Sequence, residues 1–115
     1  MLPFSIYKKG RYRVITIDED VEEGTELSEL NVIVRGMLDQ GKRTLAIRFT
    51  PRSYFGAKAV HDFVDCLEMI TENRGRLAVV SPNRYIHNFV GAIDFDHVVK
   101  VCDNEEELEY ESVTE

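Results

Sequence analysis

The chain has 115 residues, of which 43% are apolar and 30% are charged, a composition typical of one soluble globular domain. No apolar run approaches the roughly 18 residues that a membrane-spanning helix needs, and no long apolar stretch follows the basic residues near the N-terminus. We therefore expect a single cytoplasmic domain over residues 1–115, with no membrane insertion and no secretory signal.

The net charge of −7 comes from the C-terminal end of the chain. Residues 101–115 hold seven acidic residues and no basic one, so residues 1–100 hold 14 of each kind. This pattern predicts an acidic C-terminal helix and tail over about 103–115. A neutral body with an acidic tail does not favour nucleic acid as a partner.

Cysteine and histidine are too sparse and too widely spaced to indicate a metal or redox site. Cys66 and Cys102 both lie in apolar-periodic segments, so we expect two buried free thiols rather than a disulfide. His61, His87 and His97 lack the spacing of metal ligands. No metal and no cofactor is predicted.

The first half of the chain predicts a hairpin followed by a helix. Residues 4–18, "FSIYKKGRYRVITID", read as two short strands around the "KKGR" turn. After the acidic segment 18–26, Thr25 is a candidate N-cap, and Gly41 is a candidate C-terminal stop. Between them, apolar residues recur at helical spacing: Leu27, Leu30, Val34, Met37 and Leu38.

The second half alternates strands and helices. Residues 43–49, 76–80 and 97–101 are apolar and predict strands. The helix between the first two of these strands is expected to end near Gly75 and to bury Val60, Phe63, Val64, Leu67 and Ile70.

A third helix and the start of a fourth complete the predicted elements. Ser81 and Pro82 are candidate N-cap and first-turn residues of a helix with Ile86, Phe89 and Val90 inward. Asp103 and Glu106 are a candidate capping box for a short C-terminal helix. Alternating strands and helices with right-handed crossovers predict a parallel α/β sheet, with the first strand as an antiparallel edge.

The order of elements and several local passages resemble the STAS domain of bacterial anti-sigma factor antagonists. The passages are the opening hairpin, "MLDQGKRTLAIRF", "GRLAVVSPN" as the most specific, and "DHVVKVCDNEEEL", so the resemblance covers nearly the whole chain. It implies a STAS-like α/β fold: a mixed sheet of about five strands, parallel except for an antiparallel edge strand, with four helices.

The sequence departs from the family at the motif that carries its function. STAS antagonists have Asp-Ser-Ser/Thr-Gly at the start of the second helix, where phosphorylation of a serine by a kinase releases the partner. Aligned without gaps, these positions fall on Gly56, Ala57, Lys58 and Ala59, and an acidic position of the preceding strand falls on Arg48. The resemblance therefore implies a switch site that has lost its phosphate acceptor. Thr50 and Ser53 are nearby hydroxyls that either form the turn or act as a displaced phosphosite.

The resemblance implies a non-catalytic regulatory module that binds a protein, such as an anti-sigma factor or a related kinase-like regulator. The expected oligomeric state is a monomer or a weak homodimer. The candidate partner-binding residues lie in the acidic segment, the turn before the second helix, that helix and the start of the third: Asp18, Asp20, Thr50, Arg52, Ser53, Gly56, Ala57, Lys58, His61 and Arg84.

Two other classes of function remain open from the sequence. STAS-like domains also serve as accessory or scaffold subunits of lipid transporters and signalling assemblies, and a small-ligand-binding module would fit the same fold. An enzyme is the weakest option, because no order of nucleophile, base and acid is evident in the sequence.

Overall fold

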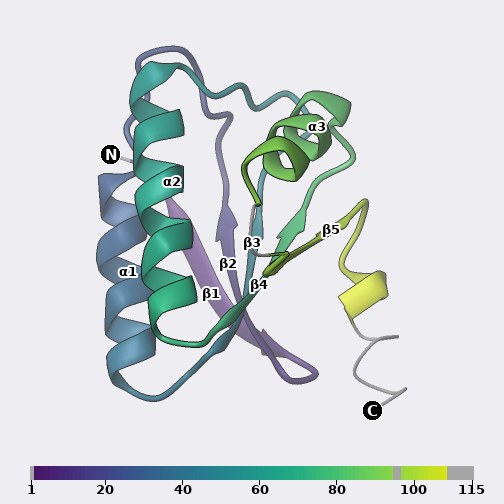
Figure 1. Ribbon diagram of the computed structural model, residues 1–115. Helices are drawn as coiled ribbons and strands as arrows, with labels where there is room; N and C mark the ends of the chain where they lie inside the picture. The colour runs from purple at the N-terminus through teal and green to yellow at the C-terminus, as the bar shows by residue number, and fades with distance from the viewer. Residues whose placement is uncertain (1, 95–96, 109–115) are drawn as a thin grey trace.

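The computed structural model describes residues 2–94 and 97–108, which form a five-stranded mixed sheet covered on one face by helices (Figure 1). The strands follow one another across the sheet in chain order. Their bounds are β1 (Phe4–Lys9), β2 (Tyr12–Ile17), β3 (Thr44–Arg48), β4 (Arg76–Val80) and β5 (Val99–Cys102).

The direction of each strand confirms the predicted α/β fold. β1 pairs antiparallel with β2 through a tight hairpin, in which Gly10 adopts a positive φ of 59°. β2, β3, β4 and β5 are mutually parallel, because a helix carries the chain back between each pair. The predicted antiparallel edge strand is therefore β1.

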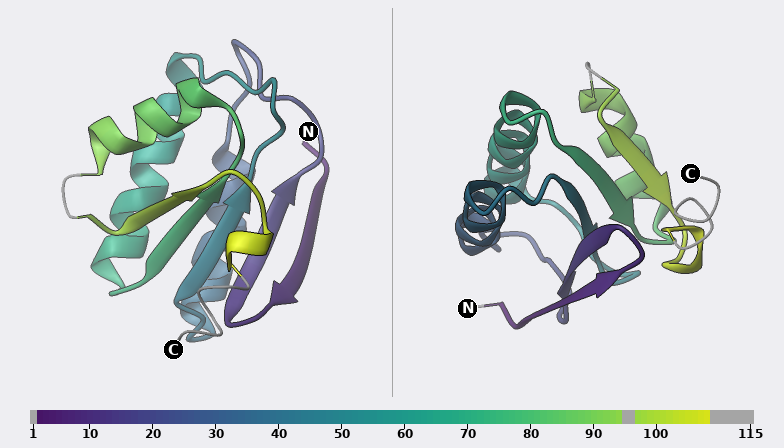
Figure 2. Two further views of the ribbon diagram at one scale, coloured as in Figure 1. Left: turned by 90° about the vertical axis from the view of Figure 1, so that its right-hand side faces the viewer. Right: turned by 90° about the horizontal axis from the view of Figure 1, so that it is seen from below.

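Three helices pack on the same face of the sheet, namely α1 (Ser28–Asp39), α2 (Ala57–Glu72) and α3 (Arg84–Ile93). Residues 106–108 are helical as well, and Leu108 packs against the opposite face (Figure 2). The predicted inward residues of the first three helices are all buried or partly buried. No helix within 2–94 and 97–108 is long and apolar enough to span a membrane.

The C-terminus of α1 ends as the sequence predicts. Gly41 has a φ of 83°, which a residue without a Cβ adopts readily. Its N–H donates to the carbonyl of Leu38 at 2.9 Å, and the N–H of Lys42 donates to the carbonyl of Met37 at 3.0 Å. These two hydrogen bonds form a Schellman motif, so Gly41 is the helix stop.

The start of α1 differs from the prediction. The helix begins at Ser28, and the hydroxyl of Thr25 instead accepts the N–H of Glu22 at 2.9 Å within a preceding turn. The cap comes from another helix, since the carboxylate of Asp62 on α2 accepts the N–H of Leu27 at 2.8 Å. The predicted cap at Thr25 was wrong because the acceptor is supplied by tertiary packing.

Two further caps lie one or two residues from their predicted positions. Asn83, rather than Ser81, caps α3 by accepting the N–H groups of Tyr85 and Ile86. Near the C-terminus, Glu107 rather than Glu106 accepts the N–H of Asp103 at 2.8 Å. Both predicted caps were wrong in register, although the helices begin within a few residues of the predicted places.

Asp62→Ala should lower the free energy of unfolding by about 1 kcal/mol, because it leaves the N–H of Leu27 without its acceptor at the start of α1. Chemical denaturation of the two proteins measures this difference. Asp65→Ala is the matched control on the same helix, since Asp65 only faces the exposed His61 at 3.5 Å. Equal losses for both variants would show that Asp62 does not cap α1.

Candidate functional site

Two loops meet at the edge where the parallel strands end. The loop of residues 18–27 follows β2, and the loop of residues 49–56 follows β3 (Figure 1). The N–H of Tyr54 donates to the carbonyl of Val21 at 2.7 Å, and the N–H of Val21 donates to the hydroxyl of Ser53 at 3.0 Å. The carboxyl edge of such a sheet is the usual place for a binding site in this class of fold.

The two hydroxyls before α2 both hold these loops together. Ser53 is only 2% exposed, and its oxygen lies 2.7 Å from the hydroxyl of Thr50. Thr50 in turn donates to the carboxylate of Asp20 at 2.5 Å. The structure thus gives both hydroxyls a structural use, and it brings together three of the predicted site residues.

The start of α2 is packed against the acidic loop. Gly56 is the N-cap residue, and no side chain caps the helix. A Cβ on Gly56 would lie 3.2 Å from the Cα of Glu23 and 3.3 Å from the N of Gly24, which is tighter than an ordinary contact. An acidic side chain at this position would therefore require the loop to move.

Positive charge stands at the exposed start of α2. Ala57 and Lys58 are both exposed, and the first turn holds no acidic residue. A helix start favours negative groups, so Lys58 is placed against the helix dipole and toward solvent. His61 lies one turn further along and pairs with Asp65.

The third helix is tied to the same edge. The amide of Asn83 donates to the carbonyls of Pro51 and Ser53, both at 2.9 Å. These bonds hold Arg84, the first residue of α3, beside the loop that carries Arg52. Arg52 and Arg84 therefore lie at the same edge of the sheet.

An exposed aromatic pair, which the sequence analysis missed, links the loop to α3. Tyr54 is 51% exposed and Tyr85 is 40% exposed, and their rings stack with centroids 5.1 Å apart. The hydroxyl of Tyr85 donates to the carbonyl of Phe55, and burial together with the nearby Tyr54 raises the pKa of Tyr85. Nothing in the local sequence predicts this contact, because the two tyrosines are far apart in the chain.

The side chains of Asp18 and Arg48, in contrast, bond to residues outside these two loops. The carboxylate of Asp18 accepts the hydroxyls of Ser5 at 2.6 Å and Thr16 at 2.9 Å, and these hydrogen bonds lower its pKa. Arg48 forms an ion pair of 2.5 Å with Glu105, which also accepts the hydroxyl of Tyr7. Arg48 thus ties β3 to the C-terminal segment.

We call the group at the carboxyl edge the α2-start surface. It consists of residues 18–26, the loop 49–56, the first turn of α2 through His61, and Arg84 with Tyr85. Its exposed groups are basic, acidic and aromatic side chains. Within the described residues, no cluster of three or more histidine, cysteine or carboxylate side chains could hold a metal ion.

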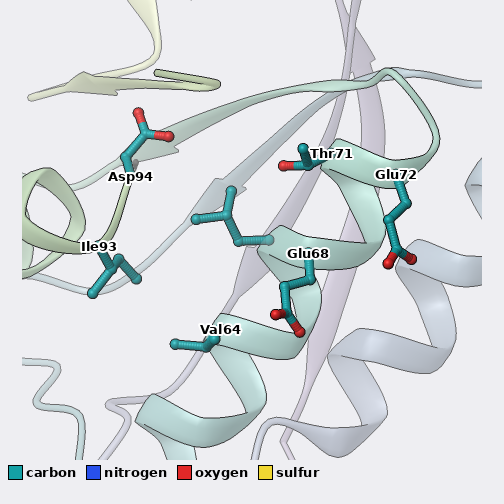
Figure 3. A pocket seen from close by; sticks show the side chains of 7 residues that line it. Val64, Glu68, Thr71, Glu72, Ile93 and Asp94 are labelled. Atoms are coloured by element: carbon teal, nitrogen blue, oxygen red, sulfur yellow. The ribbon is translucent and has the colours of Figure 1, made fainter. Parts of the chain in front are cut away.

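A separate groove of about 380 Å³ lies between α2 and the end of α3 (Figure 3). Val64, Leu67 and Ile93 give it an apolar lining, and Glu68 and Glu72 stand at its rim. Asp94 also lines it, but both of its oxygens accept backbone N–H groups, from Val98 and Val99. Cys66 and Cys102 lie elsewhere, both are buried and neither is in a disulfide, and burial raises the pKa of Cys66 to about 12.

Comparison with known proteins gives structural but not sequence relatives. No family model and no curated protein sequence matches the chain. The NMR structure of TM1081, from Thermotoga maritima, matches with a TM-score of 0.69 at 17% identity, over 100% of this chain and 90% of that one. The Bacillus cell fate determinant SpoIIAA, in its phosphorylated form, matches with a TM-score of 0.68 at 13% identity, over 94% and 98% of the two chains.

The unphosphorylated form of SpoIIAA, described as an anti-sigma factor antagonist, matches with a TM-score of 0.66 at 16% identity, over 97% of this chain and 98% of that one. The chain has the STAS-like fold of SpoIIAA. The resemblance seen in the sequence is therefore confirmed at the level of the fold, including the five-stranded mixed sheet and its single antiparallel edge pair.

Proposed function

We propose that this protein is a non-catalytic regulatory module of the anti-sigma factor antagonist type, which binds an anti-sigma factor or a related kinase-like regulator through the α2-start surface. We further propose that it works without the serine switch of the family. The fold shared with SpoIIAA supports the general kind of role. The residues at the start of α2 support a role without the serine switch.

The observation that carries the proposal is the chemistry of the first turn of α2. Gly56, Ala57, Lys58 and Ala59 offer no hydroxyl, and Lys58 places a positive charge where a phosphate would place a negative one. Phosphorylation adds a charge of about −1.5 to −2, which acts on a partner through repulsion and new hydrogen bonds. A partner that meets this surface therefore meets a permanently unphosphorylated and basic helix start.

The surface also has the side chains that concentrate binding energy in protein interfaces. Tyrosine and arginine are enriched among such residues, and Tyr54, Tyr85, Arg52 and Arg84 are all exposed here. The N–H groups at the start of α2, which no described side chain caps, favour an acidic group on the partner together with Lys58. We therefore expect the partner to present a carboxylate beside an apolar or aromatic contact.

We expect no phosphate on residues 56–59 after incubation with a co-encoded serine kinase and ATP, because these residues have no hydroxyl. Ser53 should also remain unmodified, since its oxygen is buried and hydrogen-bonded. Peptide mapping by mass spectrometry detects phosphate on residues 56–59 and on Ser53. Stoichiometric phosphate on Ser53 or Thr50 would contradict the loss of the switch and would indicate that it has moved.

The partner itself is identified by capture from the native host with the wild-type protein as bait and Lys58→Glu as the matched control bait. Recovery of an anti-sigma factor or a kinase-like regulator by the wild type alone supports the proposal. Recovery of transporter subunits by both baits would favour the accessory-subunit alternative.

A further inference from the structure

Residues 1–100 have no net charge, but many of their basic residues and their acidic loop lie at opposite ends of the sheet. Eight of the 14 basic residues lie at the end where the parallel strands begin, in the β1–β2 hairpin and in the turns that follow α1 and α2 (Figure 1). They are Lys8, Lys9, Arg11, Arg13, Lys42, Arg43, Arg74 and Arg76. The acidic loop 18–26 lies at the other end, so the α2-start surface and this basic end face away from each other.

Part of the basic end is hollowed. A surface depression of about 600 Å³ lies between the hairpin and the turn after α1. No acidic residue lines it, and its lining is Lys8, Gly10, Arg11, Arg13, Gly41, Lys42, Arg43 and Thr44. Its volume is within the range of small-molecule sites, and we call it the basic hollow.

Four of the five cations that line the hollow are not neutralised by any residue that the structure describes. Lys8, Arg13, Lys42 and Arg43 form no ion pair with any described acidic residue. The ammonium of Lys42 donates to the side-chain oxygen of Gln40 at 2.7 Å, and Nε of Arg43 donates to the carbonyl of Asn73 at 2.8 Å. Both acceptors are neutral, so these contacts orient the cations but leave their charge uncompensated.

The hairpin also contains a like-charge pair that works against its stability. Lys8 lies directly opposite Arg13 in the β1–β2 register. Directly opposed like charges destabilise an antiparallel pair. The Lys8–Arg13 pair lowers the stability of the hairpin and also adds two cations to the hollow. A locally unfavourable arrangement of this kind is typical of a functional site.

We propose that the basic hollow binds phosphoryl groups, carried either by a soluble polyphosphorylated molecule or by a lipid headgroup. Arginine and lysine are the side chains that recognise phosphate, arginine through two parallel hydrogen bonds and lysine as a point charge. Cations that converge on one depression from two separate segments match a compact, multiply charged group. The site lies at the opposite end of the sheet from the α2-start surface, so the two can be tested separately.

The soluble arm of the test is calorimetric titration of the intact protein with inorganic tripolyphosphate. We expect Lys8→Gln/Arg13→Gln to weaken binding by about fivefold or more, because two uncompensated cations are lost from the hollow. The control is Arg35→Glu, which lowers the net charge by the same two units on α1, away from both the hollow and the α2-start surface. Its affinity should stay within about twofold of the wild type, since only long-range, screened charge changes.

The lipid arm measures cosedimentation with phosphatidylcholine vesicles that contain about one part in five of phosphatidic acid, against vesicles without it. Binding that is lost in Lys8→Gln/Arg13→Gln but kept in the control supports the proposal in either arm, and the arm that responds identifies the source of the phosphate.

Folding is monitored separately by thermal unfolding without ligand. Lys8→Gln/Arg13→Gln should unfold at the wild-type temperature or above it, because the like-charge pair is removed. Lys42→Gln, which lies in a turn outside the sheet, is a second variant that should also weaken binding. Absence of binding in both arms, or equal affinity of the hollow variants and the control, would overturn the proposal.

Discussion

Phe63→Ala is expected to lower the free energy of unfolding by about 3–5 kcal/mol, the largest loss for a single substitution among those considered. Phe63 is fully buried in the middle of α2. Its ring lies 6.2 Å from that of Phe49, 5.7 Å from that of Phe55 and 6.1 Å from that of Phe89, measured between centroids. Truncation would remove contacts to both ends of the loop 49–56 and to α3 at once.

The measurement for Phe63→Ala is a urea titration followed by circular dichroism, with Lys58→Ser as the control. Lys58 is exposed at the helix start, so its replacement should change the free energy of unfolding by less than about 0.5 kcal/mol. A midpoint for Phe63→Ala close to that of the wild type would contradict the assignment of this helix face to the core.

Lys58→Glu is expected to weaken partner binding at least tenfold, about 1.4 kcal/mol. In a family-like complex, the substitution places a carboxylate near the position of the family's phosphoserine, and it reverses the charge that faces the proposed acidic group on the partner. A carboxylate has less charge and fewer acceptor oxygens than a phosphate, so the effect should be smaller than that of phosphorylation itself. Lys58→Ala removes the charge without reversing it and should have a smaller effect.

The fold could be predicted from the sequence because its elements are set by local patterns. The apolar run of β4 indicated a strand covered on both faces, and Leu77, Ala78, Val79 and Val80 are indeed all buried in the sheet. Helical periodicity identified the inward faces of α1 and α2. Gly41 was recognisable as a helix stop because glycine adopts a positive φ more readily than any other residue, and Gly41 does have a positive φ.

The helix starts could not be predicted with the same certainty. Asp62 caps α1 from α2, so the acceptor lies on a different element from the N–H that it satisfies. The sequence offers both Ser81 and Asn83 as caps of α3. Asn83 is the cap in the structure, where its amide also donates to two carbonyls of the loop 49–56. Such contacts follow from the assembled fold rather than from local propensity.

The site was only partly visible in the sequence. The missing hydroxyls at residues 56–59 could be read directly, whereas the use of Ser53 as a buried acceptor and the stack of Tyr54 on Tyr85 depend on the approach of separate loops. The basic hollow was hidden for a different reason. A net charge does not show where the charged residues lie in the fold. A domain with no net charge can therefore have its acidic turns at one end of the sheet and its basic turns at the other.

The most direct test of the proposed interface is calorimetry of the wild type, Lys58→Ala and Lys58→Glu against the captured partner, each at two salt concentrations. We expect the wild type to bind most tightly, Lys58→Ala less tightly and Lys58→Glu at least tenfold more weakly. The difference between Lys58→Glu and the wild type should shrink at the higher salt concentration, since exposed charges are screened. Equal affinities for all three proteins at both salt concentrations would contradict an interface at the start of α2.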